Sequence, residues 1–230
     1  MNDIKLYKGD CRNIIKEIKN GIVISDPPFN IGYHYNKYLD SMPEDEYMKF
    51  LKDIFQPPCV MINYPETIYK FCVYTGLVPV KVVSWVYNSN TGKQHRDIAF
   101  FGIKPNLNKV KQPYKNPNDK RIKERIKLGN TGGRIYDWWN INQVKNTSKE
   151  KTEHPCQMPL EVMKNIIGIL PEDVTIIDPF MGSGSTGVAC VMLDRNFIGI
   201  EIDDKYYEIA CERIEDAKAC SENIGTSETD

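Results

Sequence analysis

The sequence predicts an α/β protein, in which a mostly parallel β-sheet carries helices on both faces. Short apolar segments of strand length alternate along the chain with segments whose apolar residues recur at helical spacing. Two of the expected strands end in Pro-rich or Gly-rich turns that carry acidic side chains, where open α/β sheets bind ligands. The chain has 230 residues, 41% of them hydrophobic, which is enough for one sizeable core. Because alternating strands and helices form parallel sheets covered on both sides, we expect this architecture.

The first half of the chain is expected to alternate strands and helices as far as residue 103. Isoleucines at helical spacing predict an amphipathic helix over 11–19, which Gly21 ends. Pro27 and Pro28 take the chain out of the sheet, because two successive prolines cannot continue a hydrogen-bonded ladder. His95 and Arg96 are expected in a solvated loop. The strands expected in this half are 4–7, 22–24, 60–62, 80–86 and 97–103, and the remaining helices are 44–55 and 66–74.

The second half begins with a loop rich in Pro and Asn and then returns to the alternating pattern. Pro159 suits the first turn of a helix, because its missing N–H would have no partner there. The elements expected after the loop are helices at 159–170, 187–193 and 204–219 and strands at 174–178 and 197–202. Residues 220–230 are expected to form an acidic, disordered tail.

The composition argues against several classes of protein. No run of about 18 or more apolar residues is present, so we expect no membrane-spanning helix. The first residues lack the apolar core of a secretory signal. The seven cysteines include no C-x-x-C pair, which indicates reduced thiols in a cytosol rather than disulfides or structural zinc. The three histidines are not at helical spacing from one another, and no metal centre is expected.

The formal net charge of −1 conceals a strong segregation of charge along the chain. Residues 104–151 hold thirteen basic and four acidic residues, a local charge of +9, so the rest of the chain carries −10. Such asymmetry indicates a region that binds a polyanion, although a solvated surface insertion would look similar. Aromatic residues lie among the charges, as in surfaces that combine phosphate contacts with stacking. Of these, Trp138 and Trp139 are expected to pack into a core rather than to wedge into DNA.

The turn at 178–187 has the features of a nucleotide-binding loop, because it follows an apolar strand and opens a helix. Gly182 and Gly184 allow backbone to approach a ligand closely, and Gly187 allows the helix to pack near the sheet. Glu201 lies 19 residues after Gly182 (201 − 182), where a carboxylate can accept both hydroxyls of a ribose. The loop therefore predicts an adenosine-containing cofactor, with a dinucleotide or a ligand-free turn as alternatives.

The turn Asp26-Pro27-Pro28-Phe29 also follows a buried strand. The Asp26 side chain and the Pro27 carbonyl are hydrogen-bond acceptors, while Phe29 offers an aromatic face. These groups suit a planar heterocycle with an exocyclic amine, whose two N–H bonds would meet the two acceptors. Such a turn by itself is a weak signal and becomes informative beside the cofactor loop.

With both turns in place, the sequence resembles the amino-methyltransferases of DNA, which methylate adenine N6 or cytosine N4 with S-adenosylmethionine. Residues 26–29 (DPPF) look like the catalytic motif (D/N/S)-P-P-(Y/F/W), and residues 178–186 (DPFMGSGST) resemble the cofactor motif D-P-F-x-G-S-G-T-T. Residues 9–11 (GDC) resemble the early motif G-D-(C/A). Residues 154–160 (HPCQMPL) resemble H-P-T-Q-K-P-L. The resemblance covers residues 4 to 216 except for the basic segment.

The order of the motifs implies a circularly permuted, Rossmann-like class I methyltransferase fold, because the catalytic motif precedes the cofactor motif as in the β group of the family. The resemblance divides the chain into a catalytic half at 1–103, a small inserted target-recognition region at 104–151 and a cofactor-binding half at 152–219. Two positions depart from the family motif. Met158 replaces the usual Lys and removes a cationic contact, and Cys156 replaces a Thr, which weakens one hydrogen bond.

The resemblance implies a role for each matching residue. Asp26 and the Pro27 carbonyl would orient the target amine, and Phe29 would stack on the base. The implied catalytic residues are Asp26, Pro27, Pro28 and Phe29, and the implied S-adenosylmethionine-binding residues are Asp10, Cys11, Asp178, Phe180, Gly182, Ser183, Gly184, Thr186 and Glu201. The residues expected to contact double-stranded DNA are Lys109, Lys111, Lys115, Lys120, Arg121, Lys123, Arg125 and Arg134.

Adenine N6 is the expected target because the catalytic motif opens with Asp26; N4-cytosine enzymes, which more often open with Ser, stay the alternative. An NAD-dependent oxidoreductase would explain the glycine loop and Glu201 but not the turn at 26–29. A non-catalytic DNA-binding module would explain only the charge, and methyl transfer to RNA or protein is a third alternative. We expect a cytoplasmic, nucleoid-associated enzyme of a prokaryotic or phage-host cytosol, with no membrane or metal partner. Homodimers are common in the β group.

Overall fold

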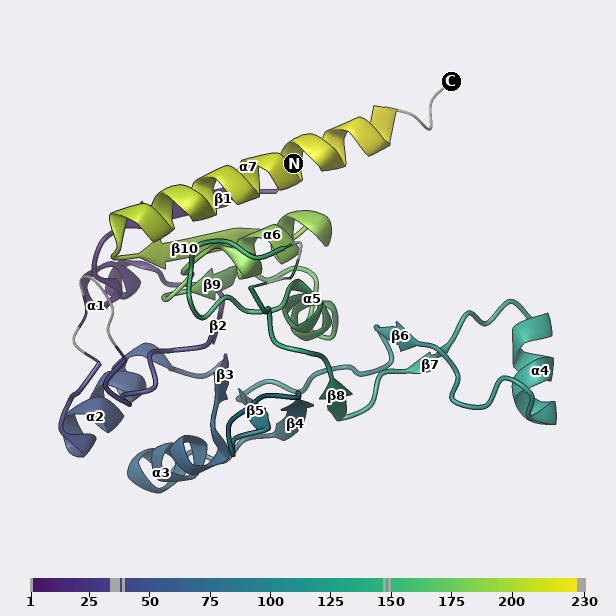
Figure 1. Cartoon of the computed structure of the whole chain (residues 1–230), viewed down its shortest axis with the longest axis horizontal. Helices are drawn as coiled ribbons and strands as arrows, with labels where there is room; N and C mark the ends of the chain where they lie inside the picture. The colour runs from purple at the N-terminus through teal and green to yellow at the C-terminus, as the bar shows by residue number, and fades with distance from the viewer. Residues whose placement is uncertain (1, 34–37, 39, 147, 149, 227–230) are drawn as a thin grey trace.

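An eight-stranded sheet runs through the body of the protein (Figure 1). The computed structural model describes residues 2–33, 38, 40–146, 148 and 150–226. In sheet order the strands are β1 (Ile4–Lys8), β10 (Phe197–Glu201), β9 (Ile176–Asp178), β2 (Ile22–Ser25), β3 (Cys59–Asn63), β5 (His95–Phe101), β4 (Lys81–Val86) and β8 (Trp138–Asn140). Neighbouring strands are parallel except that β5 runs antiparallel to both β3 and β4. The predicted mostly parallel sheet is confirmed. The circular permutation, which concerns the order of motifs relative to other family members, stays a prediction.

Helices cover both faces of the sheet (Figure 1). One face carries α1 (Cys11–Ile14), α2 (Glu44–Ile54) and α3 (Pro65–Thr75), and the other carries α5 (Leu160–Gly168), α6 (Ser185–Met192) and α7 (Asp204–Thr226). No helix in the described part of the chain has the length and hydrophobicity to cross a bilayer.

Two hydrophobic cores lie on the two faces, because successive side chains of a strand point to opposite sides. In β3, Val60 and Ile62 pack into the core beneath α5, α6 and α7. Cys59 and Met61 of the same strand pack into the core beneath α2 and α3. All four are fully buried, so β3 reads as a continuous apolar run rather than an alternating one.

Two elements in the first half of the chain differ from the sequence-based expectations. The first helix is shorter than 11–19: α1 ends at Ile14 and a 3₁₀ turn over Ile15–Glu17 follows, closed by the Ile18 N–H donating to the Ile15 carbonyl. The strand expected to begin at Asp97 begins at His95, so the solvated loop expected for His95 and Arg96 is wrong. The pairing of β5 with β4 extends the strand, since Arg96 stands opposite Trp85 and the Tyr87 N–H donates to Gln94 beyond the last pair.

The C-terminal helix is longer than expected. It continues from Asp204 to Thr226, so the disordered tail predicted from residue 220 is wrong for 220–226, while 227–230 lie outside the described residues. The helix packs along α6 through Ala210 and Ile214, which are both fully buried.

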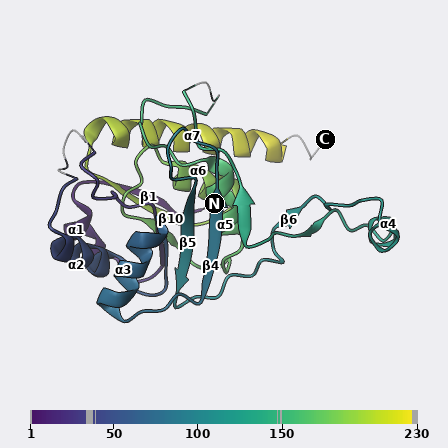
Figure 2. The same cartoon turned by 60° about the horizontal axis from the view of Figure 1, so that its bottom comes forward.

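A slender arm projects from the body beside the β4–β8 edge (Figures 1 and 2). It consists of the short antiparallel ribbon of β6 (Lys111–Gln112) and β7 (Gly133–Arg134), with α4 (Lys120–Lys127) at its tip. The segment 104–151 is therefore not a single insertion. Its later part returns to the body, where β8 pairs with β4 and where Ile135 and Trp139 are buried in the core. The expected core packing holds for Trp139, whereas Trp138 is 48% exposed.

Candidate active site

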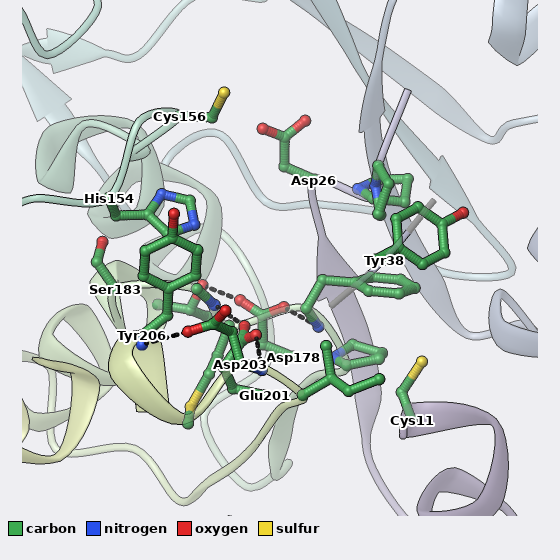
Figure 3. A pocket seen from close by; sticks show the side chains of 18 of the residues that line it. Cys11, Asp26, Tyr38, His154, Cys156, Asp178, Ser183, Glu201, Asp203 and Tyr206 are labelled. Atoms are coloured by element: carbon green, nitrogen blue, oxygen red, sulfur yellow. Dashed lines mark hydrogen bonds between the residues drawn. The ribbon is translucent and has the colours of Figure 1, made fainter. Parts of the chain in front are cut away.

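A cleft lies at the carboxyl ends of β1, β10, β9 and β2, the place where open parallel sheets bind ligands (Figure 3). Each strand delivers an acidic residue to it. Asp10 follows β1, Glu201 ends β10, Asp178 ends β9 and Asp26 follows β2. The two turns that the sequence singled out separately, 26–29 and 178–187, thus contribute to one site.

Asp178 holds the glycine loop in shape and ties it to the catalytic turn. One carboxylate oxygen, Oδ1, accepts a hydrogen bond from the Ser25 hydroxyl at 2.5 Å and one from the Phe180 N–H at 3.1 Å. The other oxygen accepts from the Thr186 hydroxyl. Burial raises the pKa of Asp178, while these hydrogen bonds favour its ionised form. Asp178 and Thr186 line the cleft and have partners within the protein, so their role is to shape the loop.

Glu201 forms the floor of the cleft, 8% exposed. Its Oε2 accepts from the Gly182 N–H at 2.9 Å and its Oε1 from the Asp203 N–H at 2.8 Å. Each oxygen keeps a second lone pair, so the carboxylate can still accept two hydroxyls of a ligand. Burial raises the pKa of Glu201, and the backbone donors counteract that rise.

The two glycines of the loop have different surroundings. Gly182 has a φ of +51° and lines the cleft, where a Cβ would lie 2.8 Å from the His154 ring nitrogen Nε2. Gly184, with a φ of +79°, packs against α7 instead, since a Cβ there would lie 3.0 Å from the Ala210 Cα. Gly184 is not among the residues that line the cleft, so the direct cofactor contact predicted for it has no support in the geometry.

Asp10 and Cys11 lie at the opposite side of the cleft from His154, as Figure 3 shows for Cys11. Asp10 caps α1 by accepting from the Arg12 N–H at 2.9 Å, and its carboxylate pairs with the Arg12 guanidinium, which lowers the pKa of Asp10. Burial raises the pKa of the Cys11 thiol to about 12, so the thiol is neutral at physiological pH. Phe180 and Ser183 also line the cleft, as predicted.

The Asp26 side chain is only 11% exposed and forms an ion pair with Arg96, which the sequence analysis expected in a solvated loop. Its Oδ2 accepts from Nη1 of Arg96 at 2.8 Å. Its Oδ1 is buried and has no hydrogen-bond partner among the described residues. Burial raises the pKa of Asp26 to about 6, Arg96 opposes this rise, and the nearby Asp178 adds to it. Pro27, Pro28 and Phe29 line the same part of the cleft.

Several cleft residues had not been singled out by the sequence. Asp203 is buried and caps α7, accepting from the backbone N–H groups of Lys205 at 3.0 Å and Tyr206 at 3.2 Å. The Tyr206 ring meets the His154 ring edge-on at 4.4 Å, and burial lowers the pKa of His154 to about 4. An acidic residue directly before a predicted helix signals a cap, so Asp203 could have been found. Tyr38 carries no such signal.

The predicted DNA contacts lie on the arm, with one exception. Lys109 stands at its base, where its ammonium pairs with Glu172 at 2.7 Å, so Lys109 anchors the arm to the body. Lys115 lies over the rings of Tyr136 and Trp138, at 4.9 and 5.2 Å from their centroids. The other six predicted residues are exposed on the ribbon or on α4: Lys111, Lys120, Arg121, Lys123, Arg125 and Arg134.

The sheet, its covering helices and the loops at its strand ends place the protein among Rossmann-like class I methyltransferases. A model of the family described as DNA methylase matches residues 77–212, more than half of the chain, and the protein belongs to this family. It is 28% identical over 240 residues to the type II methyltransferase M.HpaI of Haemophilus parainfluenzae, with 89% of this chain and 73% of that protein covered.

Two further similarities agree with this assignment. The chain is 26% identical over 246 residues to the DNA adenine methyltransferase YhdJ of Escherichia coli, with 91% of this chain and 82% of that protein covered. The M1.HpyAVI–SAM complex superposes with a TM-score of 0.58 at 27% identity, covering 91% of this chain and 99% of that one. The protein is thus an S-adenosylmethionine-dependent DNA methyltransferase.

The residues of the cleft fit S-adenosylmethionine. The buried Glu201 carboxylate, with a spare acceptor site on each oxygen, suits the two ribose hydroxyls. The Phe180 ring gives the cleft an apolar wall for an adenine. Asp10 and Asp203 make the cleft negative, which suits a ligand that carries a sulfonium and an ammonium.

Proposed function

We propose that the protein transfers the methyl group of S-adenosylmethionine to N6 of an adenine that is extruded from duplex DNA. The observation that carries the proposal is the pair formed by Asp26 and Phe29 in the cofactor cleft. Asp26 offers Oδ1, a buried acceptor without a partner among the described residues, and Phe29 offers an aromatic ring next to it. An unsatisfied buried acceptor is costly in a folded protein, and a donor from the substrate would satisfy it. The name of the relative YhdJ, a DNA adenine methyltransferase, supports the choice of adenine.

The residues of the turn would act by positioning. Oδ1 of Asp26 and the Pro27 carbonyl would accept the two amino N–H bonds, which directs the nitrogen lone pair at the methyl group. S-adenosylmethionine would supply the methyl group from its sulfonium and would leave as the neutral thioether. Asp26 or the solvent would take the proton that the methylated amine loses. Phe29 would stack on the base, which is worth about 1–3 kcal/mol and offsets part of the cost of extruding it.

The arm would hold the duplex. Residues 111–134 contain eight basic and two acidic residues, and the side chains of α4 are exposed or half-exposed. Lysine and arginine on an exposed ribbon and helix can neutralise phosphates and release their counterions. Since α4 is short and has no core behind it, contact with DNA would also stabilise the helix.

Mass spectrometry of nucleosides tests the proposal. The enzyme is incubated with labelled S-adenosylmethionine and genomic DNA from a host that lacks methylation, and the DNA is then digested. We expect label in N6-methyladenine, and label only in N4-methylcytosine would make the alternative target correct. Asp26→Ala should bind the cofactor like the wild type and transfer no methyl group; continued transfer would remove Asp26 from the site.

A further inference from the structure

Arg96 is a buried cation in contact with the catalytic turn. It lies in β5, 7% exposed, and none of the motifs includes it. Its guanidinium donates to Asp26 at 2.8 Å and lies 4.6 Å from the centroid of the Phe29 ring. The same guanidinium lies 5.4 Å from the centroid of the Trp85 ring and donates to the Met158 sulfur at 3.7 Å. One side chain therefore touches the first and last residues of the catalytic turn and the motif at 154–160.

The pairing of β4 with β5 does not by itself require a cation at this position. Arg96 stands opposite the buried Trp85 in the β4–β5 ladder, where an apolar residue would pack without charge. Its Nε has no hydrogen-bond partner among the described residues, so the burial of the guanidinium is incompletely compensated. Replacing a buried ion pair by apolar residues often leaves a protein as stable or more so. The arginine is thus better explained by what it does to Asp26 than by stability.

The contacts of Arg96 make the two oxygens of Asp26 unequal. Oδ2 is held by the guanidinium, whereas Oδ1 is buried and has no hydrogen-bond partner among the described residues. Under the proposed function, the target amine would be its partner. The guanidinium also lies over the Phe29 ring, and this contact favours the present orientation of the ring. Arg96 is not among the residues that line the cleft, so it acts through Asp26 and Phe29 and not on a ligand.

We propose that Arg96 is a positioning residue for methyl transfer, which holds the Asp26 carboxylate and the Phe29 ring in the arrangement that receives the target amine. The inference rests on the proposed function of the turn and adds a residue from β5, which none of the four sequence motifs compared above includes.

The charge of Arg96 also acts on the titration of Asp26. The groups that face this pair are Asp178 at the end of β9, Tyr64 after β3, Tyr87 after β4 and Cys156 in the segment before α5. Arg96 is the cation among these groups. The pKa of Asp26 is about 6 with Arg96 in place, and Arg96 lowers it against the effect of burial. Without the guanidinium the pKa would be higher, and the carboxylate would become protonated at a higher pH.

Two variants test the proposal. Arg96→Met removes the charge and fills a similar volume, whereas Arg96→Lys keeps the charge and loses the planar guanidinium. Initial rates of methyl transfer to unmethylated genomic DNA are measured from acidic to neutral pH, and cofactor affinity is measured by equilibrium dialysis. We expect Arg96→Met to lose about 100-fold in kcat, with unchanged cofactor affinity, and the acidic limb of its profile to move to higher pH. Arg96→Lys is expected to lose about tenfold in kcat, and the acidic limb of its pH profile should stay near the wild-type position.

The outcomes separate this proposal from the one on which it rests. A wild-type enzyme that leaves adenine unmethylated contradicts the proposed function, whatever the variants do. If the wild type methylates adenine, an Arg96→Met enzyme within about threefold of its kcat overturns the positioning role. So does a lower kcat with an unmoved acidic limb, which would indicate a structural effect. Should Arg96→Met fail to fold, Arg96→Lys decides alone, and a wild-type kcat in that variant overturns the proposal.

Discussion

The Ser25 hydroxyl donates a hydrogen bond to the Asp178 carboxylate, and this bond joins the catalytic turn to the cofactor loop across 153 residues of sequence. Ser25 is the last residue of β2 and Asp178 the last of β9, and both are buried. Under the proposed function, the relative position of the methyl acceptor and the methyl donor would depend on this contact between two strand ends.

Ser25→Ala should loosen this connection. The variant leaves one lone pair of a buried carboxylate without its donor, which costs about 1–3 kcal/mol in the free energy of unfolding. Urea denaturation measures this loss, and methyl transfer at saturating cofactor should fall as well. Ser221→Ala on the exposed side of α7 removes a hydroxyl that donates to the Ala217 carbonyl and is the matched control. Equal stability of the two variants would contradict the importance of the bond.

The rate of methyl transfer should rise with pH through about 6. Burial raises the pKa of Asp26 to about 6, so below that pH the carboxyl is protonated and can no longer accept from both the amine and Arg96. His154, with its pKa lowered to about 4, stays neutral over this range and does not contribute. Initial rates at saturating cofactor give the profile. A flat profile from about pH 5 to 8 would show that the ionisation of Asp26 does not limit the reaction.

Neutralising α4 should weaken DNA binding and reduce its dependence on salt. The triple variant is Lys120→Gln, Arg121→Gln and Lys123→Gln. A plot of the logarithm of the DNA association constant against the logarithm of the salt concentration has a negative slope. In the variant this slope should become shallower by about 0.9 for each phosphate that is no longer neutralised. Fluorescence anisotropy with a labelled duplex measures the slope, and kcat at saturating DNA should be retained. The control triple on the body is Lys16→Gln, Lys19→Gln and Lys52→Gln, whose residues are exposed. An equal effect of the control would mean that the whole surface, and not the arm, binds the duplex.

Gly187→Ala should destabilise the protein although alanine favours helices. A Cβ at Gly187 would lie 2.4 Å from Ile214 Cδ1 and 2.8 Å from Phe197 Cε1. Either these buried side chains or α6 itself must shift, at a cost of about 1–3 kcal/mol. The melting temperature should fall accordingly. Gly92, in the β4–β5 loop, has no neighbour within 4 Å of such a Cβ, and Gly92→Ala is the control. A Gly187→Ala protein as stable as that control would show that the interface of α6 and α7 adapts freely.

Much of the fold followed from the sequence because its signals are local. Apolar runs such as 60–62 are continuous because both faces of β3 are covered. The glycine loop is recognisable because few other turns need its residue types. The catalytic and cofactor turns were each predicted at the carboxyl end of a strand, where open parallel sheets bind ligands. The structure brings them into the same cleft.

The parts that sequence reasoning missed depend on contacts between distant segments. Arg96 looked like a loop residue because the pairing with β4 that makes it a strand residue is not visible in its own neighbours. Its partner Asp26 lies 70 residues away. The segment 104–151 was treated as one unit because it is predominantly basic, whereas the pairing of β8 with β4 divides it. Local periodicity carries no information about such pairings.

The position of β1 has a consequence for the order in which the chain can fold during synthesis. In the sheet, β1 is an edge strand whose neighbour is β10, and Ile4 pairs with Phe197. β1 is therefore synthesised 193 residues (197 − 4) before its partner strand, and such distant pairings form slowly. Asp10, which follows β1, reaches its place in the cleft only then. A nascent or truncated chain that ends before β10 would leave the cleft incomplete on the Asp10 side.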